Sequence, residues 1–414
     1  MDERERFVPR RVGKLTAQLA ERPFPAGVAE SADDLRALSR VVAALVHVEL
    51  LDREREATEA WEVIGDDPDA VERVVVELRA LVERANFVPL EVGDLEAVLA
   101  QQALVRLRLE VHLDDYDELV LYRRGSRTQT FVVRRWRGVR TKEITTTVDD
   151  RVVVFTRIKP ASWFEERDVD PAERNLTPGA ANLKLFRDVP RPDLEMLLPA
   201  TRVRFRRSDT VKVGVPALAS AILVATTKLL PTIGLVFLLI GAAVGLRRDT
   251  PRIDQEALVL LLGGVFALGL YVFRQWKRLE NRRIKYLKVL NENLYFRTVA
   301  DGAGVFHTLY ASAEEQEVAE ILLAYRFLLD VPDGCTPEEL DAAVEAFLAE
   351  GGDGDVDFEV DDAVAKLRRL GIVEDGPLLR AVPLPTALLV LDRRWHALFR
   401  LDEPVVTAPD PART

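Results

Sequence analysis

Two long apolar runs in the middle of the chain constrain this sequence more than any other feature. The first reads VGVPALASAILVATTKLLPTIGLVFLLIGAAVGL over residues 213–246, and the second reads ALVLLLGGVFALGLYVF over residues 257–273. A helix needs about 20 mainly apolar residues to cross a hydrocarbon core that is about 30 Å thick. The runs therefore predict a transmembrane helical hairpin within residues 211–275.

The number of crossings depends on how the first run is interpreted. It is longer than one span requires, and Pro231 removes a backbone donor near its middle. One kinked helix and two short segments are therefore both open. Basic residues are concentrated before and after the two runs and are fewer in the loop between them. Because cytoplasmic flanks carry the excess of Lys and Arg, two crossings are favoured over three.

The amino-terminal sequence MDERERFVPRR is charged and lacks the apolar core of a cleavable signal. The hairpin is therefore expected to be an internal anchor between two soluble parts. This arrangement predicts a multi-pass protein of a plasma membrane, with its amino and carboxy termini in the cytoplasm.

Hydrophobic periodicity divides the rest of the chain into regions. Residues 1–117 carry apolar residues at helical spacing and predict a helical N-terminal region. Residues 118–200 switch to a period of two, which predicts a four-stranded antiparallel β-meander followed by a pre-membrane segment. The expected turns lie at Gly125-Ser126, Gly138 and Asp149-Asp150. After the hairpin, residues 276–309 predict a basic juxtamembrane helix and connector.

Residues 310–401 show helical patterns followed by a hairpin pattern, which predicts a winged-helix-like domain, and residues 402–414 predict a disordered tail. One helix begins at Thr336-Pro337, and Glu339 completes a capping box. Cys335, the only cysteine, is expected to pack against Leu340, so a structural role is favoured over a nucleophilic one. The overall prediction is an α+β membrane protein.

Charge is segregated between these regions. The meander carries eleven basic and four acidic residues between residues 118 and 159, whereas residues 310–401 carry eight basic and twenty acidic residues. Phosphate contacts dominate nucleic-acid affinity, so this acidic domain and a net charge of −11 disfavour nucleic acid as a partner. The opposite charges predict either that the acidic domain docks on the sheet, or that the sheet contacts anionic lipid while the acidic domain recruits a basic protein partner.

Several strings along the chain resemble one family. They are RFVPRR, LVHVELLDRERE, KLFRDVPRPDLEMLLP, VFRQWKRLENRRIKYLKVLNENLYFR, GVFHTL and DFEVDDAVAKLRRLGIV. The resemblance is to an uncharacterised membrane-protein family that includes animal transmembrane protein 143, a mitochondrial protein, with plastid and prokaryotic relatives. It implies paired spans with soluble flanks and implies no activity or catalytic residue. Because a transit-like amino terminus is absent, a prokaryotic member is expected.

Motifs of catalysis are missing from the sequence. It contains no phosphate-binding loop, nucleophile elbow or H-E-x-x-H helix. An acidic patch, from His112 to Asp117, has ligands suited to a divalent cation, but a solvated turn is the favoured interpretation. His47, His307 and His396 have no partner that the sequence reveals. We therefore predict no catalytic residue, cofactor or metal.

Two sets of candidate site residues follow from the membrane interpretation. Basic residues beside the second run suit anionic lipid head groups or serve only as a topology signal. These candidate lipid-contact residues are Arg274, Lys277, Arg278, Arg282, Arg283 and Lys285. Lys228 is a candidate intramembrane polar residue, because charges within spans often mark function, although its side chain can also extend to an interface.

The favoured functional hypothesis is a non-enzymatic scaffold or regulator, anchored in a prokaryotic plasma membrane, whose partners are the bilayer and a protein at the acidic domain. The first alternative is a transport or channel subunit built from oligomerised hairpins, in which the glycines of the runs pack helices closely. The second alternative is a metal-dependent hydrolase that uses the patch from His112 to Asp117.

Overall fold

The structure is a computed structural model that describes most of the chain outside the apolar runs. The described residues are 4–24, 31–65, 67–90, 108–110, 112–135, 140–174, 176–199, 202–204, 266, 270, 273, 274, 277, 296–352, 354–374 and 376–398. The chain forms two compact units. The first comprises Met1–Ala100, Leu113–Leu194 and Arg297–Thr414, and the second comprises Gln101–His112 and Glu195–Phe296.

The helices described before the sheet are α1 (Val12–Glu21), α2 (Ala32–Glu62) and α3 (Pro68–Arg84). The Ser31 hydroxyl caps α2 by accepting a hydrogen bond from the backbone N–H of Asp34, and the Asp67 carboxylate caps α3. Such oxygens satisfy N–H groups that have no partner within the helix, which fixes where each helix begins. Residues 91–107 of the predicted helical region lie outside the described residues.

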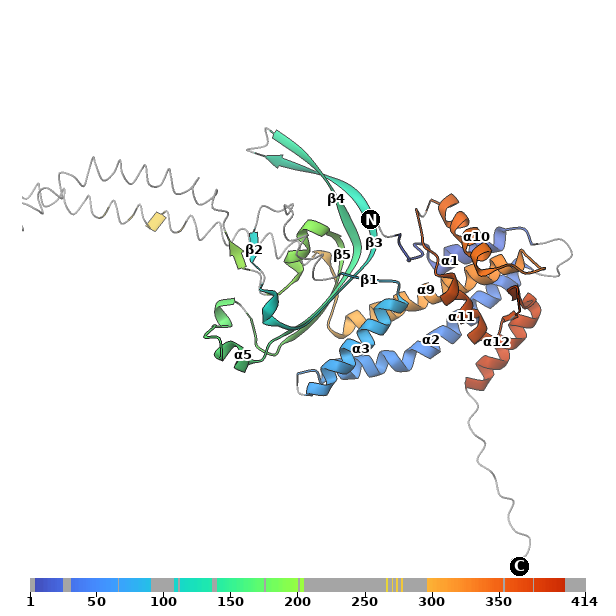
Figure 1. Ribbon diagram of the computed structural model, residues 1–414, viewed down its shortest axis with the longest axis horizontal. Helices are drawn as coiled ribbons and strands as arrows, with labels where there is room; N and C mark the ends of the chain where they lie inside the picture. The colour runs from blue at the N-terminus through green and yellow to red at the C-terminus, as the bar shows by residue number, and fades with distance from the viewer. Residues whose placement is uncertain are drawn as a thin grey trace, which may run out of the picture. The chain divides into compact units, whose positions relative to one another are not determined.

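An antiparallel sheet follows, with the strand order β1–β3–β4–β5–β7. Its strands are β1 (Val88–Pro89), β3 (Tyr116–Arg135), β4 (Arg140–Ile158), β5 (Ala181–Pro190) and β7 (Thr298–Asp301). Short helical turns accompany the sheet: η1 (Leu113–Asp115), α5 (Ala161–Glu165), η2 (Ala172–Arg174) and η3 (Arg191–Leu197). Strand β7 pairs with β5 through Lys184 and Asp301, so segments on either side of the apolar runs share one sheet (Figure 1).

The predicted four-stranded meander is wrong in its turns. Strands β3 and β4 form one long hairpin that runs through both Gly125-Ser126 and Asp149-Asp150 without reversing (Figure 1). Gly125 has a φ of +66°, and a Cβ atom there would lie 2.9 Å from the Asp150 carboxylate. The position therefore requires glycine for an irregularity inside a strand, not for a turn. Gly138, at the third expected turn, lies outside the described residues.

The C-terminal elements are α9 (Ala303–Leu329), α10 (Pro337–Glu350), α11 (Val360–Leu370), β8 (Val373–Glu374), β9 (Arg380–Ala381) and α12 (Leu384–Leu398). The capping box of Thr336 and Glu339 is confirmed. Cys335 is buried, exchanges two backbone hydrogen bonds with Leu379, and has a thiol whose pKa is raised by burial. Both observations fit the structural role expected for this cysteine. Residues 402–414 lie outside the described residues.

Helix α9 lies at the centre of the core. All of its side chains from Gln316 to Leu329 are buried, and α1, α2, α3, α10 and α11 pack against it. One face of the sheet joins the same core through residues such as Val120, Phe155 and Leu185. Residues from both ends of the chain therefore share one apolar core, and the burial of this surface stabilises their association.

The second unit is described mainly by one strand pair. Strand β2 (Arg108–Glu110) pairs antiparallel with β6 (Arg202–Arg204). This pair joins two segments that are distant in the sequence.

The membrane part of the predicted fold requires correction. Among the helices that the structure describes, none combines the length and the apolar character that a bilayer crossing requires. Helices α2 and α9 are long enough, but α2 is rich in charged residues, and α9 carries carboxylates and is buried by other helices. The finding contradicts the predicted α+β membrane protein and its predicted multi-pass place in a plasma membrane. We retain the α+β architecture with its antiparallel sheet.

The sequence on which that prediction rested is largely undescribed. Residues 213–246 lie outside the described residues, and so do residues 257–273 except for three single positions. These three positions, Phe266, Leu270 and Phe273, are helical and exposed.

Candidate functional site

The predicted lipid-contact residues are only partly described. Arg274 and Lys277 are helical and exposed. Arg278, Arg282, Arg283 and Lys285 lie outside the described residues, as does Lys228. The structure therefore brings none of these residues into a described site.

The acidic patch near the start of β3 is largely neutralised by neighbouring cations. The buried Asp115 carboxylate accepts two hydrogen bonds from Arg174, at 2.5 and 2.8 Å, and Asp117 accepts one from Lys159 at 2.9 Å. No cluster of three metal-ligating side chains is found among the described residues. This geometry gives no support to the metal-dependent hydrolase alternative.

Two histidines find partners on a neighbouring helix that the sequence did not reveal, and a third, His396, lies 3.5 Å from Asp392 of its own helix. The His47 ring nitrogen lies 3.0 Å from the Glu314 carboxylate, and His307 contacts Glu54. The pairs cross the same antiparallel contact of α2 with α9, and each helix supplies one histidine and one glutamate. Both rings are more than half exposed, and His307 borders a groove on α2 that Glu54 and Thr58 also line.

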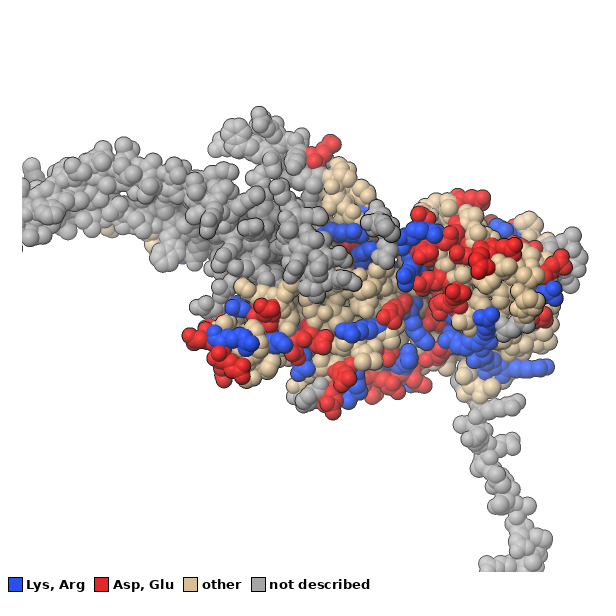
Figure 2. All heavy atoms as spheres, in the orientation of Figure 1, with Lys and Arg blue, Asp and Glu red and all other residues tan. Residues whose placement is uncertain are grey.

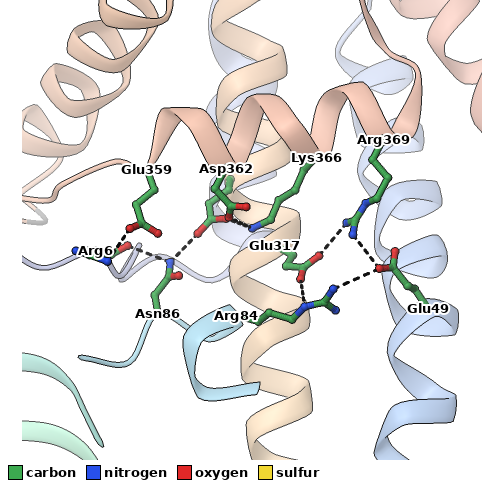
Figure 3. Close-up of polar contacts among 10 residues, drawn as sticks. Arg6, Glu49, Arg84, Asn86, Glu317, Glu359, Asp362, Lys366 and Arg369 are labelled. Atoms are coloured by element: carbon green, nitrogen blue, oxygen red, sulfur yellow. Dashed lines mark hydrogen bonds and ion pairs between the residues drawn. The ribbon is translucent and has the colours of Figure 1, made fainter. Parts of the chain in front are cut away.

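The strongest concentration of buried charge lies where α2, α3, α9 and α11 meet (Figure 3). We call it the helix-junction cluster. Its members are Glu49, Arg84, Asn86, Glu317, Glu320, Asp362, Lys366 and Arg369. They come from segments more than 300 residues apart in the sequence, so the cluster connects the two ends of the chain.

One part of the cluster is a closed ring of alternating charge. Arg369 of α11 donates to Glu49 of α2 at 2.8 Å and to Glu317 of α9 at 3.1 Å. Arg84 of α3 lies 3.5 Å from Glu317 and 3.6 Å from Glu49, which closes the ring. The Glu317 side chain is only 2% exposed, so its charge depends on these two guanidinium groups. Each of the four helices supplies one member.

A second part of the cluster is the ion pair of Glu320 and Lys366. Their side chains are 3% and 8% exposed. Burial lowers the pKa of Lys366, but the surrounding carboxylates, above all that of Glu320, outweigh burial and raise it above its ordinary value. Burial is the largest influence on Glu320 and leaves the pKa of this carboxyl above its ordinary value, although Lys366 and Asn86 act in the opposite direction. The lysine therefore stays protonated, and Asp362 gives it a further partner at 2.6 Å.

Asn86 connects this pair with the first residues of the chain. Its side-chain amide donates to the Glu320 carboxylate at 2.6 Å and to the backbone carbonyl of Arg6 at 3.0 Å. Asn86 has a φ of +56°, in the left-handed region that asparagine tolerates better than most residues. This turn directly after α3 places the amide between the two acceptors (Figure 3).

The arrangement joins segments and offers little for catalysis. The carboxylates of Glu317 and Glu320 are engaged by cations within the protein, and the cation of Lys366 is engaged by carboxylates. A general base or nucleophile needs a reactive atom that a substrate can reach. The helix-junction cluster therefore has a structural role, in which its ion pairs hold the helices together.

This cluster was not predicted from the sequence, although the spacing of the charged residues on α9 and α11 indicates it. Glu317 and Glu320 are three residues apart on α9, and Lys366 and Arg369 are three apart on α11. The pairs match in antiparallel order, Glu317 with Arg369 and Glu320 with Lys366. Charges at such positions in otherwise apolar patterns indicate a buried ion ladder, but the sequence does not say which helices are neighbours.

Comparison with known proteins gives a family without an assigned activity. Residues 149–304 match the model of a family described as protein of unknown function (DUF3754). The match begins in β4 and extends to the start of α9, so it spans the apolar runs and β7. No solved structure matches the chain. The resemblance to the family of transmembrane protein 143 remains an expectation.

Proposed function

We propose that this protein is a non-enzymatic scaffold or regulator whose first compact unit serves as a rigid binding platform. The helix-junction cluster carries the proposal, because it uses its buried charges to hold four helices together. Precise presentation of a binding surface requires elements whose side chains are fixed by packing and hydrogen bonds. A clamp of this kind provides that rigidity.

The charge on the platform favours a protein partner over nucleic acid. Lys366 and Arg369 of α11 are directed to carboxylates of the protein itself. Figure 2 shows acidic side chains gathered over the α10 region, with basic side chains at their border toward the sheet. An acidic surface repels phosphates, so it suits a basic protein segment.

The platform proposal predicts that its helices unfold together. Two variants, each retaining one tryptophan, test this: one keeps Trp61 of α2 and the other keeps Trp395 of α12, with the other tryptophans changed to Phe. Both residues pack at the edge of the shared core. Urea unfolding followed by fluorescence should give the same midpoint and slope for both probes, because a cooperative unit loses all its parts at once.

A separate transition at lower urea for Trp395 would mean that the C-terminal helices form an independent module. That outcome would contradict a single platform. Circular dichroism of the same samples serves as the control, since it follows all helices and should coincide with both tryptophan signals.

A further inference from the structure

Residues 4–8, which read RERFV, lie as an extended strap between the sheet and the C-terminal helices. We call this segment the strap. Its backbone forms a parallel bridge, Glu5 with Val356, and the Glu5 carbonyl accepts a hydrogen bond from the backbone N–H of Asp357 at 2.9 Å. The strap therefore pairs with the 355–359 segment through a single isolated β-bridge. Backbone pairing of an extended segment is one of the recurring modes of peptide recognition.

Two arginines of the strap face the acidic C-terminal helices. Arg4 lies 2.7 Å from Glu345 and 2.9 Å from Asp355, and it donates to the Val356 carbonyl at 2.7 Å. Arg6 lies 2.9 Å from Glu359. An Arg-x-Arg spacing in an extended segment places both side chains on one side, which is where the carboxylates are.

The alternate residues of the strap face the sheet. The Glu5 carboxylate accepts hydrogen bonds from Arg123 at 3.1 Å and from the Ser126 hydroxyl at 2.7 Å. The Phe7 ring stacks under the Arg124 guanidinium, whose carbon lies 4.5 Å from the ring centroid. Burial and a neighbouring cation lower the pKa of Arg124 to about 10, as expected for a guanidinium held between aromatic rings and backbone.

The last strap residue is held by its backbone. The Gln316 side chain of α9 accepts a hydrogen bond from the Val8 N–H at 2.9 Å and donates to the Val8 carbonyl at 3.1 Å. Both residues are almost fully buried. A buried amide that bonds both polar groups of one residue holds an extended chain whatever its side chain, so Gln316 acts as a backbone clamp.

We propose that the strap occupies a peptide-binding groove, and that an extended segment of a partner protein with the pattern Arg-x-Arg-aromatic-aliphatic binds there in its place. Carboxylates select the two arginines, Arg124 selects the aromatic residue, and Gln316 holds the backbone. The inference rests on the proposed platform, because the groove exists only where the sheet, α9 and the 355–359 segment are held together.

Tethering makes the strap a built-in competitor. A segment joined to its site by a short linker has an effective concentration in the millimolar range, so a free peptide displaces it poorly. Weakening the strap without disturbing the groove should therefore open the site. Arg4 and Arg6 are suitable targets, because both side chains are partly exposed and belong to the occupant.

The test measures fluorescence anisotropy of a labelled peptide with the sequence DERERFVPRR, residues 2–11, added to the full chain. The variant Arg4→Ala/Arg6→Ala should bind this peptide at least about tenfold more tightly than the unaltered protein does. A matched peptide with alanine in place of both arginines should bind this variant about tenfold more weakly, because the change affects only the peptide and not the competing strap.

A second measurement uses the unaltered protein. Deuterium exchange at the Val8 amide should increase when unlabelled peptide is present at about 1 mM, because the peptide replaces the strap. This readout holds even where the variants fold poorly.

The results separate the two proposals. A folded variant that shows no saturable binding, or that binds the alanine-substituted peptide equally well, would mean that the strap is only a structural segment. The tryptophan experiment still tests the platform proposal in that case, because it requires no peptide.

Discussion

The strap and the helix-junction cluster both use ion pairs to connect distant parts of the chain, but these ion pairs differ in exposure. The Arg4 side chain is 39% exposed, whereas the Lys366 and Glu320 side chains are almost fully buried. An exposed pair contributes little because water and salt screen it. A buried pair becomes costly when one partner is lost, because the other charge has no replacement for its hydration. The buried cluster therefore fixes which helices meet, whereas the exposed ion pairs of the strap contribute less to holding it in place.

The strongest test of this difference is Lys366→Met. The substitution leaves Glu320 buried without its cation, so the free energy of unfolding should fall by about 3–5 kcal/mol. Urea unfolding followed by circular dichroism measures the change.

The control for this test replaces both partners. In Glu320→Met/Lys366→Met no charge of the pair is left buried, and most of the lost stability should return, since apolar replacement of a buried pair is often neutral. A double variant as unstable as the single one would show that the site requires charge for another reason.

A smaller loss is expected for Gln316→Ala. The substitution leaves the N–H and carbonyl of Val8 buried without their partner, which costs about 1–3 kcal/mol. Gln316→Glu is the sharper comparison, because a carboxylate accepts from the N–H but cannot donate to the carbonyl. Equal stability of both variants and the unaltered protein, measured by urea unfolding, would show that Gln316 does not hold the backbone of Val8.

Alkaline pH should weaken the cluster. The pKa of Lys366 is raised in the folded protein above its ordinary value of 10.5. Its contribution is therefore fully present below that ordinary value and is lost as the pH rises through the folded pKa. The stability difference between the unaltered protein and Lys366→Met should stay constant up to about pH 10 and shrink above it. A difference that shrinks below pH 9 would contradict the assignment.

The smallest effect is expected for Arg4→Ala. Its ion pairs with Glu345 and Asp355 are partly exposed, so the loss in unfolding free energy should stay below about 1 kcal/mol and should become smaller in 0.5 M salt. Thermal unfolding at low and high salt checks this. A loss above about 2 kcal/mol would mean that the ion pairs of Arg4 stabilise the fold as strongly as a buried ion pair does, which would contradict the difference between the strap and the helix-junction cluster.

Much of the local structure was predictable because local chemistry determines it. Ser31 and the Thr336–Glu339 capping box mark helix starts through oxygens that satisfy unpaired N–H groups. The alternation after residue 118 correctly indicated an antiparallel sheet. Gly125 misled the prediction because glycine serves both turns and irregularities within strands, and only pairing across the sheet distinguishes the two.

The functional elements were less predictable because they depend on tertiary neighbours. The sequence shows that the first residues are charged. It does not show that alternate side chains contact the sheet and the acidic helices, because this depends on where those elements lie. The membrane interpretation relied on two apolar runs, whereas the described helices owe their apolar residues to a shared protein core.

Native-state hydrogen exchange of the full chain can compare the Val8 amide of the strap with the Leu367 and Leu370 amides of α11. We expect Val8, corrected for intrinsic rate, to exchange at least about tenfold faster, because the strap opens while the platform stays folded. Equal protection at all three amides would mean that the strap leaves only on global unfolding, and this result would contradict an exchangeable strap on a rigid platform.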